Sequence, residues 1–186
     1  MNFNTILAVA TAAIVSFTAT GAFAQSEKEK KQAEVRKQTE QALADFYKSE
    51  PQLRAEVAKA PGYAVFSTFG MSFLIGGAGG KGVAVDNKTK KVTYMDLAGA
   101  SAGLTIGAQQ ARYLYVFKDT AALQRFIDSG WDAGAELAAG AGAGGKSGTA
   151  QAATFTGGRV YMLTKAGFQA SAAVGGTKVW KDKELN

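Results

Sequence analysis

The chain has 186 residues, of which 47% are hydrophobic and 19% charged, and its 21 basic and 15 acidic side chains give a formal net charge of +6. This composition is that of a folding chain with room for one ordinary domain. It contains no cysteine and no histidine, which excludes disulfides, thiolate metal sites and histidine-dependent nucleophile systems within it. The basic balance favours anionic partners such as lipid headgroups, acidic glycans or nucleic acid.

Residues 1–24 have the pattern of a signal peptide. The apolar run from Ile6 to Phe17 is too short to span a bilayer comfortably. Ala22-Phe23-Ala24 before Gln25 is typical of a signal-peptidase site. No lysine or arginine precedes the run, which departs from the usual pattern, and a membrane anchor or a buried helix is the alternative. We expect cleavage near Ala24–Gln25 and a periplasmic or extracellular protein, either free or peripheral on a membrane.

Residues 25–49 are expected to form a charged helix, followed by the main domain at 50–186. Apolar residues in the second half of this helix recur at helical spacing and form a stripe on one face, at Val35, Ala42, Leu43, Phe46 and Tyr47. We interpret the stripe as docking on the core of the domain. The alternative is a membrane-facing amphipathic helix, which the nearly even charge balance of the segment disfavours.

A second short helix follows. Ser49 is predicted to cap it, with Pro51 in its first turn and Gln52 at the capping-box position, and Pro61-Gly62 ends it.

After Pro61 the chain consists of short apolar or alternating runs broken by glycine. Val83 to Tyr94 predicts a hairpin with its turn at Asp86-Asn87-Lys88-Thr89. The stretch 68–73 is turn-like, residues 119–128 predict a short helix capped by Asp119 or Thr120, and 135–145 returns to small-residue strand character. The predicted fold is α+β: N-terminal helices packed on a glycine-rich, mostly antiparallel or barrel-like sheet with one short inserted helix.

The stretch from Gly140 to Ser147 matches the pattern G-x-x-x-x-G-K-S of a nucleotide-binding P-loop. Such a loop needs an apolar strand before it and a helix starting at its lysine and serine. The preceding "AELAA" is a poor strand, and the following Gly148-Thr149 is a weak helix start. We therefore predict no nucleotide binding and read the stretch as a small-residue strand running into a turn.

Taken in order, the segments of the chain resemble the SYLF-domain family of lipid-binding proteins, from about Pro51 to Asn186. The features that carry the resemblance are the strand and glycine segment "PGYAVFSTFGMSFLIGGAGGKGVAV", the strand pair with Ser101, Gly103, Gly107 and Gln109, the helix and small-residue turn "AALQRFIDSGWDAGAELAAGAGAGGK", and the closing hairpin "VYMLTKAGFQASAAVGGTKVWKDKELN". No single motif is specific, but the ordered set is.

The resemblance implies binding of phosphoinositides and anionic membranes for eukaryotic members, and lipid binding by analogy for exported bacterial ones. One departure is visible. The family's turn carries proline in "GPxGR", whereas here Ala143 or its neighbour replaces the proline and Lys146 stands where the family has arginine. The basic character of the turn is kept, and its rigidity is lost.

The candidate site consists of cations at predicted turns and strand ends. They form a headgroup-binding surface in one interpretation and a solubilising surface in the other: Lys81, Lys88, Lys90, Lys91, Arg112, Lys146 and Arg159. Phe69, Met71 and Phe73 are candidates for membrane contact, although such residues more often belong to a core.

We expect a non-enzymatic protein with no catalytic residue, metal or cofactor, because the acidic residues are better explained as turns and caps than as a catalytic pair. Nucleic acid is disfavoured by the scarcity of aromatic residues among the basic ones. The alternative to lipid binding is an exported structural or protein-interaction module, and a carboxylate or Ser-Lys hydrolase is a remote third hypothesis.

Overall fold

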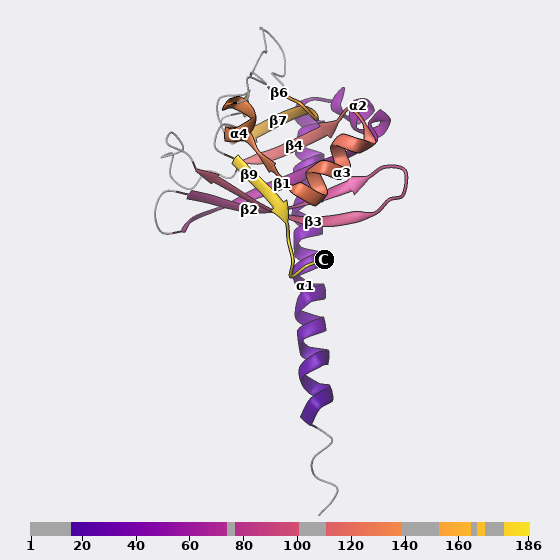
Figure 1. Ribbon diagram of the computed structural model, residues 1–186, viewed down its shortest axis with the longest axis vertical. Helices are drawn as coiled ribbons and strands as arrows, with labels where there is room; N and C mark the ends of the chain where they lie inside the picture. Colours follow the sequence, from indigo (N-terminus) through magenta and orange to yellow (C-terminus); the bar gives the residue numbers. More distant parts are fainter. Residues whose placement is uncertain (1–15, 74–76, 101–110, 139–152, 165–166, 170–176) are drawn as a thin grey trace, which may run out of the picture.

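A computed structural model describes residues 16–73, 77–100, 111–138, 153–164, 167–169 and 177–186 (Figure 1). The helices are α1 (Ser16–Ser49), α2 (Leu53–Lys59), α3 (Thr120–Ser129) and α4 (Ala133–Ala138). The strands are β1 (Gly62–Phe73), β2 (Gly77–Asp86), β3 (Val92–Ala100), β4 (Arg112–Phe117), β5 (Trp131–Asp132), β6 (Ala153–Phe155), β7 (Gly158–Thr164), β8 (Gly167–Gln169) and β9 (Thr177–Lys181).

The strands of the described part form one nine-stranded sheet in the order β5-β9-β3-β2-β1-β4-β7-β6, with β8 also paired to β7. Each of these pairings is antiparallel. Strand β7 pairs with β4 on one side, while β6 and β8 follow each other along its other side. The predicted α+β class with an antiparallel sheet is confirmed.

Strand β4 shows why both faces of the sheet are buried at its centre. Tyr113, Tyr115 and Phe117 alternate with Leu114 and Val116, and all five are buried. The three aromatic residues join a core cluster that includes α3, and the two aliphatic ones join a cluster with α1 and α2. A strand covered on both faces carries a continuous apolar run, as "RYLYVF" does.

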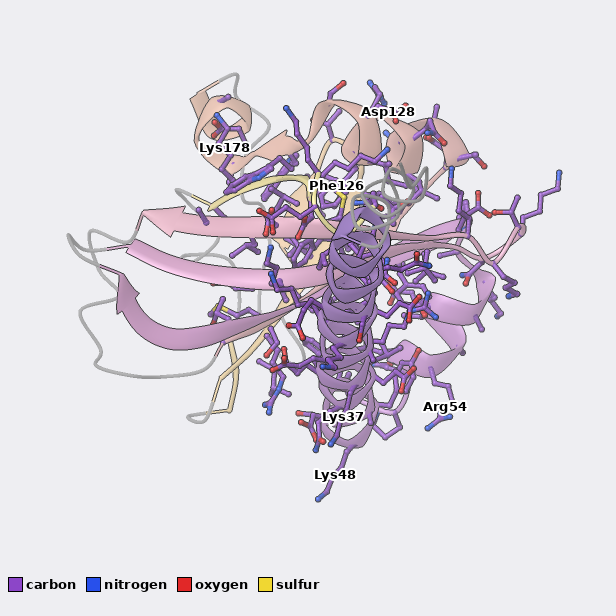
Figure 2. All side chains as sticks on the ribbon, turned by 90° about the horizontal axis from the view of Figure 1, so that it is seen from below. Lys37, Lys48, Arg54, Phe126, Asp128 and Lys178 are labelled. Atoms are coloured by element: carbon purple, nitrogen blue, oxygen red, sulfur yellow. The ribbon has the colours of Figure 1, made fainter. Side chains whose placement is uncertain are left out.

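Helix α3 covers the first of these faces. The side chain of Asp119 accepts a hydrogen bond from Ala122 N at 2.7 Å, which caps the helix as predicted. Gly130 follows its last residue with a φ of 74°, a conformation that favours glycine. Phe126 faces the sheet and is buried, whereas Asp128 lies on the outer side (Figure 2).

Helix α1 covers the other face with its C-terminal half and projects well beyond the sheet with its N-terminal half (Figure 1). Val35, Ala42 and Phe46 of the predicted stripe are buried, and Leu43 and Tyr47 pack against the same cluster as Ala42 and Phe46. The stripe therefore docks on the domain, and the alternative of a membrane-facing stripe is wrong. The helix begins at Ser16 and runs without a break through the predicted cleavage position. Among the helices described, none has the length and apolarity needed to cross a bilayer.

The sheet curls until its two end strands approach each other. Strands β5 and β6 stand at opposite ends of the strand order, yet the rings of Trp131 in β5 and Phe155 in β6 have centroids 5.5 Å apart. Both rings are partly buried and pack against the core cluster that includes α3. The concave side of the sheet is therefore filled by α3 and closed at its rim by this aromatic contact.

Three local predictions are wrong. Ser49 is the last residue of α1, and α2 begins after Gln52, whose side chain makes no cap hydrogen bond. The stretch 68–73 is no turn but the end of the continuous strand β1, which pairs with β2 through a register shift between Phe69 and Phe73. Residues 135–138 lie in α4, because Ala-Glu-Leu-Ala has high helix propensity. The predicted strand from 139 and the P-loop match lie outside the described residues.

Candidate functional site

The hairpin between β2 and β3 presents three of the predicted cations. Asp86 Oδ1 accepts hydrogen bonds from Lys88 N and Thr89 N, both at 2.8 Å, and Lys90 adopts a φ of 60°. The backbone hydrogen bonds from Thr89 and Lys88 lower the pKa of Asp86 below its usual value, and they outweigh desolvation, which acts in the opposite direction. The carboxylate therefore stays ionised and accepts both hydrogen bonds of the turn. Lys88, Lys90 and Lys91 are all exposed.

This hairpin is fixed to α2 by the side chain next to Lys88. Asn87 Nδ2 donates to Val57 O at 2.7 Å and to Ala60 O at 2.9 Å. Asn87 N also donates to Pro61 O at 2.9 Å. These bonds satisfy carbonyls at the C-terminus of α2 and hold the exposed Lys59 of that helix beside the hairpin.

A fifth cation lies at the same end of the sheet. Lys118 is exposed and follows β4, whose Val116 pairs with Tyr63 of β1, which in turn pairs with Val85 of β2. We call this end, defined by Lys59, Lys88, Lys90, Lys91 and Lys118, the basic end. Within the described part of the chain, the ion pairs found involve none of these five lysines.

Three other predicted site residues are ion-paired within the domain. Arg112 Nη2 lies 3.2 Å from a carboxylate oxygen of Asp45 in α1. Arg159 Nη1 lies 3.3 Å from Glu56 of α2, which also accepts a hydrogen bond from Tyr161 at 2.8 Å. Burial and this bond to Glu56 raise the pKa of Tyr161 to about 12. These two arginines fasten helices to the sheet.

Lys81 is the third ion-paired residue. Its Nζ lies 2.6 Å from Asp96 and 2.5 Å from Asp182. Burial alone would lower the pKa of Lys81, but the hydrogen bonds to Asp182 and Asp96 outweigh burial and raise it. Its charge is therefore matched by two carboxylates, in contrast to the lysines of the basic end.

The remaining predicted residues lie elsewhere. Phe69, Met71 and Phe73 are in the second half of β1, which pairs with the beginning of β2, and their side chains are outside the described residues. The ten residues of β2 separate that end from the hairpin, a distance of about 30 Å at the usual rise of about 3.3 Å per residue. The structure thus places the proposed aromatic contact and the basic hairpin at opposite ends of the sheet. Lys146 lies outside the described residues.

The C-terminal residues form a network that sequence reasoning did not predict. Asp182, 1% exposed, accepts hydrogen bonds from Glu184 N at 2.8 Å and Leu185 N at 3.0 Å. Asn186 pairs with the backbone of Tyr94 in both directions, accepting from its N–H and donating to its carbonyl. Aspartate side chains often accept hydrogen bonds from backbone N–H groups two or three residues further along and so favour a turn. The sequence "DKELN" therefore contained a signal from which this turn could have been predicted.

The same segment is attached to α1. Lys28 Nζ donates to Asn186 O at 2.9 Å, and Gln32 Nε2 donates to Leu185 O at 2.7 Å. Leu185 is buried in a cluster with Val35 of α1, Val83 of β2 and Tyr94 of β3. Figure 1 shows this end of the chain lying beside α1 below the sheet. The network is a clasp that joins the C-terminal segment, the sheet and α1.

On the concave side, Tyr115 is the centre of an aromatic cluster. Its ring contacts those of Phe66, Phe126, Trp131 and Phe155 at centroid distances of 5.7, 5.2, 5.3 and 5.9 Å. No group of three or more acidic side chains that could hold a metal occurs in the part of the chain that the structure describes.

The architecture defines an α+β protein with a curled antiparallel sheet and helices on both faces. Residues 98–186 match the family model Ysc84, described as "Las17-binding protein actin regulator". The chain is also similar to beta cell expansion factor A of Aeromonas veronii, with 34% identity over 145 residues that cover 77% of this chain and 54% of that protein. The chain thus spans about half the length of this curated relative.

Residues 98–186 of the chain belong to the Ysc84, or SYLF, family. The resemblance to the SYLF family that the ordered segments indicated is confirmed. The family model matches residues 98–186 of the segment from Pro51 to Asn186 that carries this resemblance.

Proposed function

We propose that this chain is an exported, non-enzymatic SYLF protein that binds anionic lipid surfaces through its basic end. The observation that supports the proposal is the difference between two groups of cations. Lys81, Arg112 and Arg159 are matched by carboxylates, whereas the five lysines of the basic end are exposed at one end of the sheet.

The carboxylates at the basic end are already engaged by the backbone. Asp86 accepts from the turn N–H groups, and Asp119 accepts from the first turn of α3. The end therefore presents a rigid positive surface. Each lysine near an anionic bilayer contributes about 1 kcal/mol, and the attraction is screened over about 10 Å at moderate salt.

Co-sedimentation with vesicles tests this proposal. We expect wild-type protein to bind phosphatidylcholine vesicles that contain phosphatidylglycerol, to dissociate at high salt, and to ignore vesicles of phosphatidylcholine alone. Replacing Lys88, Lys90 and Lys91 by alanine should weaken binding about a hundredfold, because three contributions of about 1 kcal/mol are lost.

The matched control removes the same charge elsewhere. Lys37 and Lys48 lie on α1, on the side of the molecule opposite to α3 (Figure 2), and Lys183 lies in the C-terminal segment, all three exposed. Their triple alanine variant should keep most of the affinity. An equal loss in both variants would show that binding follows net charge and not the basic end. No binding to phosphatidylglycerol vesicles at low salt would refute lipid binding.

The second candidate function is a protein-interaction module without lipid affinity. Trp180 of β9 is 41% exposed, the large hydrophobic residue most open to solvent among those described. An exposed indole is typical of protein interfaces, and the description of the family model names a protein partner. This function would be favoured if the wild-type protein did not bind vesicles and bound a protein partner only when Trp180 was present.

Export rests on the sequence pattern of residues 1–24. N-terminal sequencing of the protein secreted from its host should find Gln25 first. A chain that retains Met1 would contradict export by cleavage.

A further inference from the structure

A continuous row of side chains crosses the outer face of the sheet. Strand pairing places Trp180 of β9 opposite Asp96 of β3, and Asp96 opposite Lys81 of β2. Lys81 is in turn opposite Ser67 of β1, and Ser67 is opposite Arg112 of β4. Cross-strand partners share one face of a sheet, and neighbouring strands lie about 4.8 Å apart, so the five residues form a row about 19 Å long. We call them the cross-strand row.

The cross-strand row lies beside α1 and is open to solvent. Val83 and Tyr94 are buried in a cluster with Val35 of α1, which shows that this helix covers their face of the sheet. Lys81 and Asp96 stand two residues further along the same strands and therefore on the same face. Seen along α1, the strands extend beyond the helix on both sides (Figure 2). The side chain of Lys81 is 39% exposed and that of Asp96 is 22% exposed.

Small residues border the row on the side away from the cluster that α1 covers. Ala98 and Gly79 pair with each other two residues further along β3 and β2. Both are partly exposed, and a Cβ added at Gly79 would meet no described atom within 4 Å. Trp180, at the end of the row, is 41% exposed. The surface beside this indole is therefore open to a ligand that lies flat on the sheet.

The charges of the row are already matched within the protein. Lys81 lies between the carboxylates of Asp96 and Asp182, and Arg112 lies 3.2 Å from Asp45. Ammonium, guanidinium and carboxylate groups have more donor or acceptor positions than one ion pair uses. The row therefore offers hydrogen bonds from side chains that their ion pairs hold in place, with charges that nearly cancel. This combination suits a neutral polar ligand better than an ion.

We propose that the cross-strand row binds a neutral oligosaccharide that lies across the strands with one sugar ring stacked on Trp180. A sugar ring has an apolar face of C–H groups and an edge of hydroxyl groups. The indole supplies the contact for the apolar face, and the other four residues of the row donate to or accept from the hydroxyl groups. A row about 19 Å long favours a chain of several sugars over a single one. This inference concerns a different surface from the basic end and does not depend on lipid binding.

The test uses cellohexaose as the probe, because its chain is neutral and extended. We expect a saturable change in tryptophan emission and saturable heat in titration calorimetry, with glucose binding at least about tenfold more weakly because it reaches only part of the row. Replacing Trp180 by alanine removes an exposed ring, so the variant should fold and bind cellohexaose at least about tenfold more weakly. Lys181→Ala is the matched control, because Lys181 is exposed and is the next residue of the same strand, on its other face.

A second variant blocks the surface and leaves the row itself intact. Gly79→Phe places a ring where an added Cβ meets no described atom, so it should keep the circular dichroism spectrum of wild type and lose cellohexaose binding. The variant with Lys88, Lys90 and Lys91 replaced by alanine should bind the probe as wild type does, whatever its behaviour with vesicles. The proposal is overturned if millimolar cellohexaose gives no saturable response, if Trp180→Ala binds it as tightly as wild type, or if the triple lysine variant loses binding.

Discussion

Replacing Asp182 tests the clasp that joins the C-terminal segment to the sheet and α1. Asp182→Ala removes the carboxylate that receives Lys81 Nζ at 2.5 Å and two backbone N–H groups. A hydrogen bond to a charged group contributes about 1.5–3 kcal/mol. The side chain of Lys81 is 39% exposed, so solvent screens the attraction and the lower end applies.

The backbone bonds add a contribution of the size of a helix cap, about 1 kcal/mol. We therefore expect Asp182→Ala to lower the free energy of unfolding by about 2.5 kcal/mol, which corresponds to a fall in Tm of about 5–10 °C. Asp182→Asn keeps an oxygen for the two N–H groups and loses the charge, so it should lose only about 1.5 kcal/mol. Urea unfolding followed by circular dichroism measures both values.

The pH dependence of this difference follows from the pKa of Asp182. Burial alone would raise this pKa, but the hydrogen bonds from Lys81, Leu185 N and Glu184 N hold it below the ordinary value of 3.8. A lowered pKa means that the stabilisation is fully present above about 3.8 and is lost as the pH falls through the folded-state value. The stability gap between wild type and Asp182→Asn should therefore be constant near neutrality and close in acid.

Two results would refute this reasoning. If Asp182→Ala unfolds within about 0.5 kcal/mol of wild type, the clasp does not stabilise the fold. If the gap between wild type and Asp182→Asn persists unchanged at strongly acidic pH, the ion pair with Lys81 is not its source.

Two further predictions concern the core and are measured by the same unfolding assay. Phe46→Ala should lower the free energy of unfolding by about 3–5 kcal/mol, because Phe46 is fully buried between α1 and the sheet. The control Gln41→Ala, on the exposed side of α1, should change this free energy little. A small effect of Phe46→Ala would show that α1 is not docked. Gly82→Ala should destabilise the sheet by about 1–3 kcal/mol, because an added Cβ would meet the Phe66 ring and the Val65 carbonyl oxygen, and an unchanged Tm would contradict this close approach.

Local signals in the sequence were sufficient for several elements. The turn at Asp86, the cap at Asp119 and the apolar stripe from Val35 to Tyr47 each depend on residues within one or two turns of one another. The structure confirms all three. The family could also be recognised from the sequence, because several weak motifs in a fixed order are specific together although none of them is specific alone.

Long-range pairing overrode local signals elsewhere. The turn-like stretch around Gly70 is part of β1, because pairing with β2 continues on both sides of it as far as Phe73. Residues 135–138, Ala-Glu-Leu-Ala, pair with no strand in the described part of the chain and adopt the helix that alanine and leucine favour.

Some features of the candidate site could likewise be predicted from local sequence, whereas others depend on long-range pairing. The exposure of Lys88, Lys90 and Lys91 followed from their turn. The pairing of Lys81 with Asp182, 101 residues away, could not be read from spacing. Nor could the sequence show that β2 separates the basic hairpin from Phe69, Met71 and Phe73, since that depends on which ends of antiparallel strands meet.

The clasp also has a consequence for the order of folding. The bond between Lys28 and Asn186 joins residues 158 apart, and Gln32 and Leu185 are nearly as distant. Closing so long a loop carries an entropic cost before any contact rewards it, and folding slows as contacts become less local. We therefore expect the clasp to be among the last contacts to form, because the residues that it joins lie so far apart along the chain.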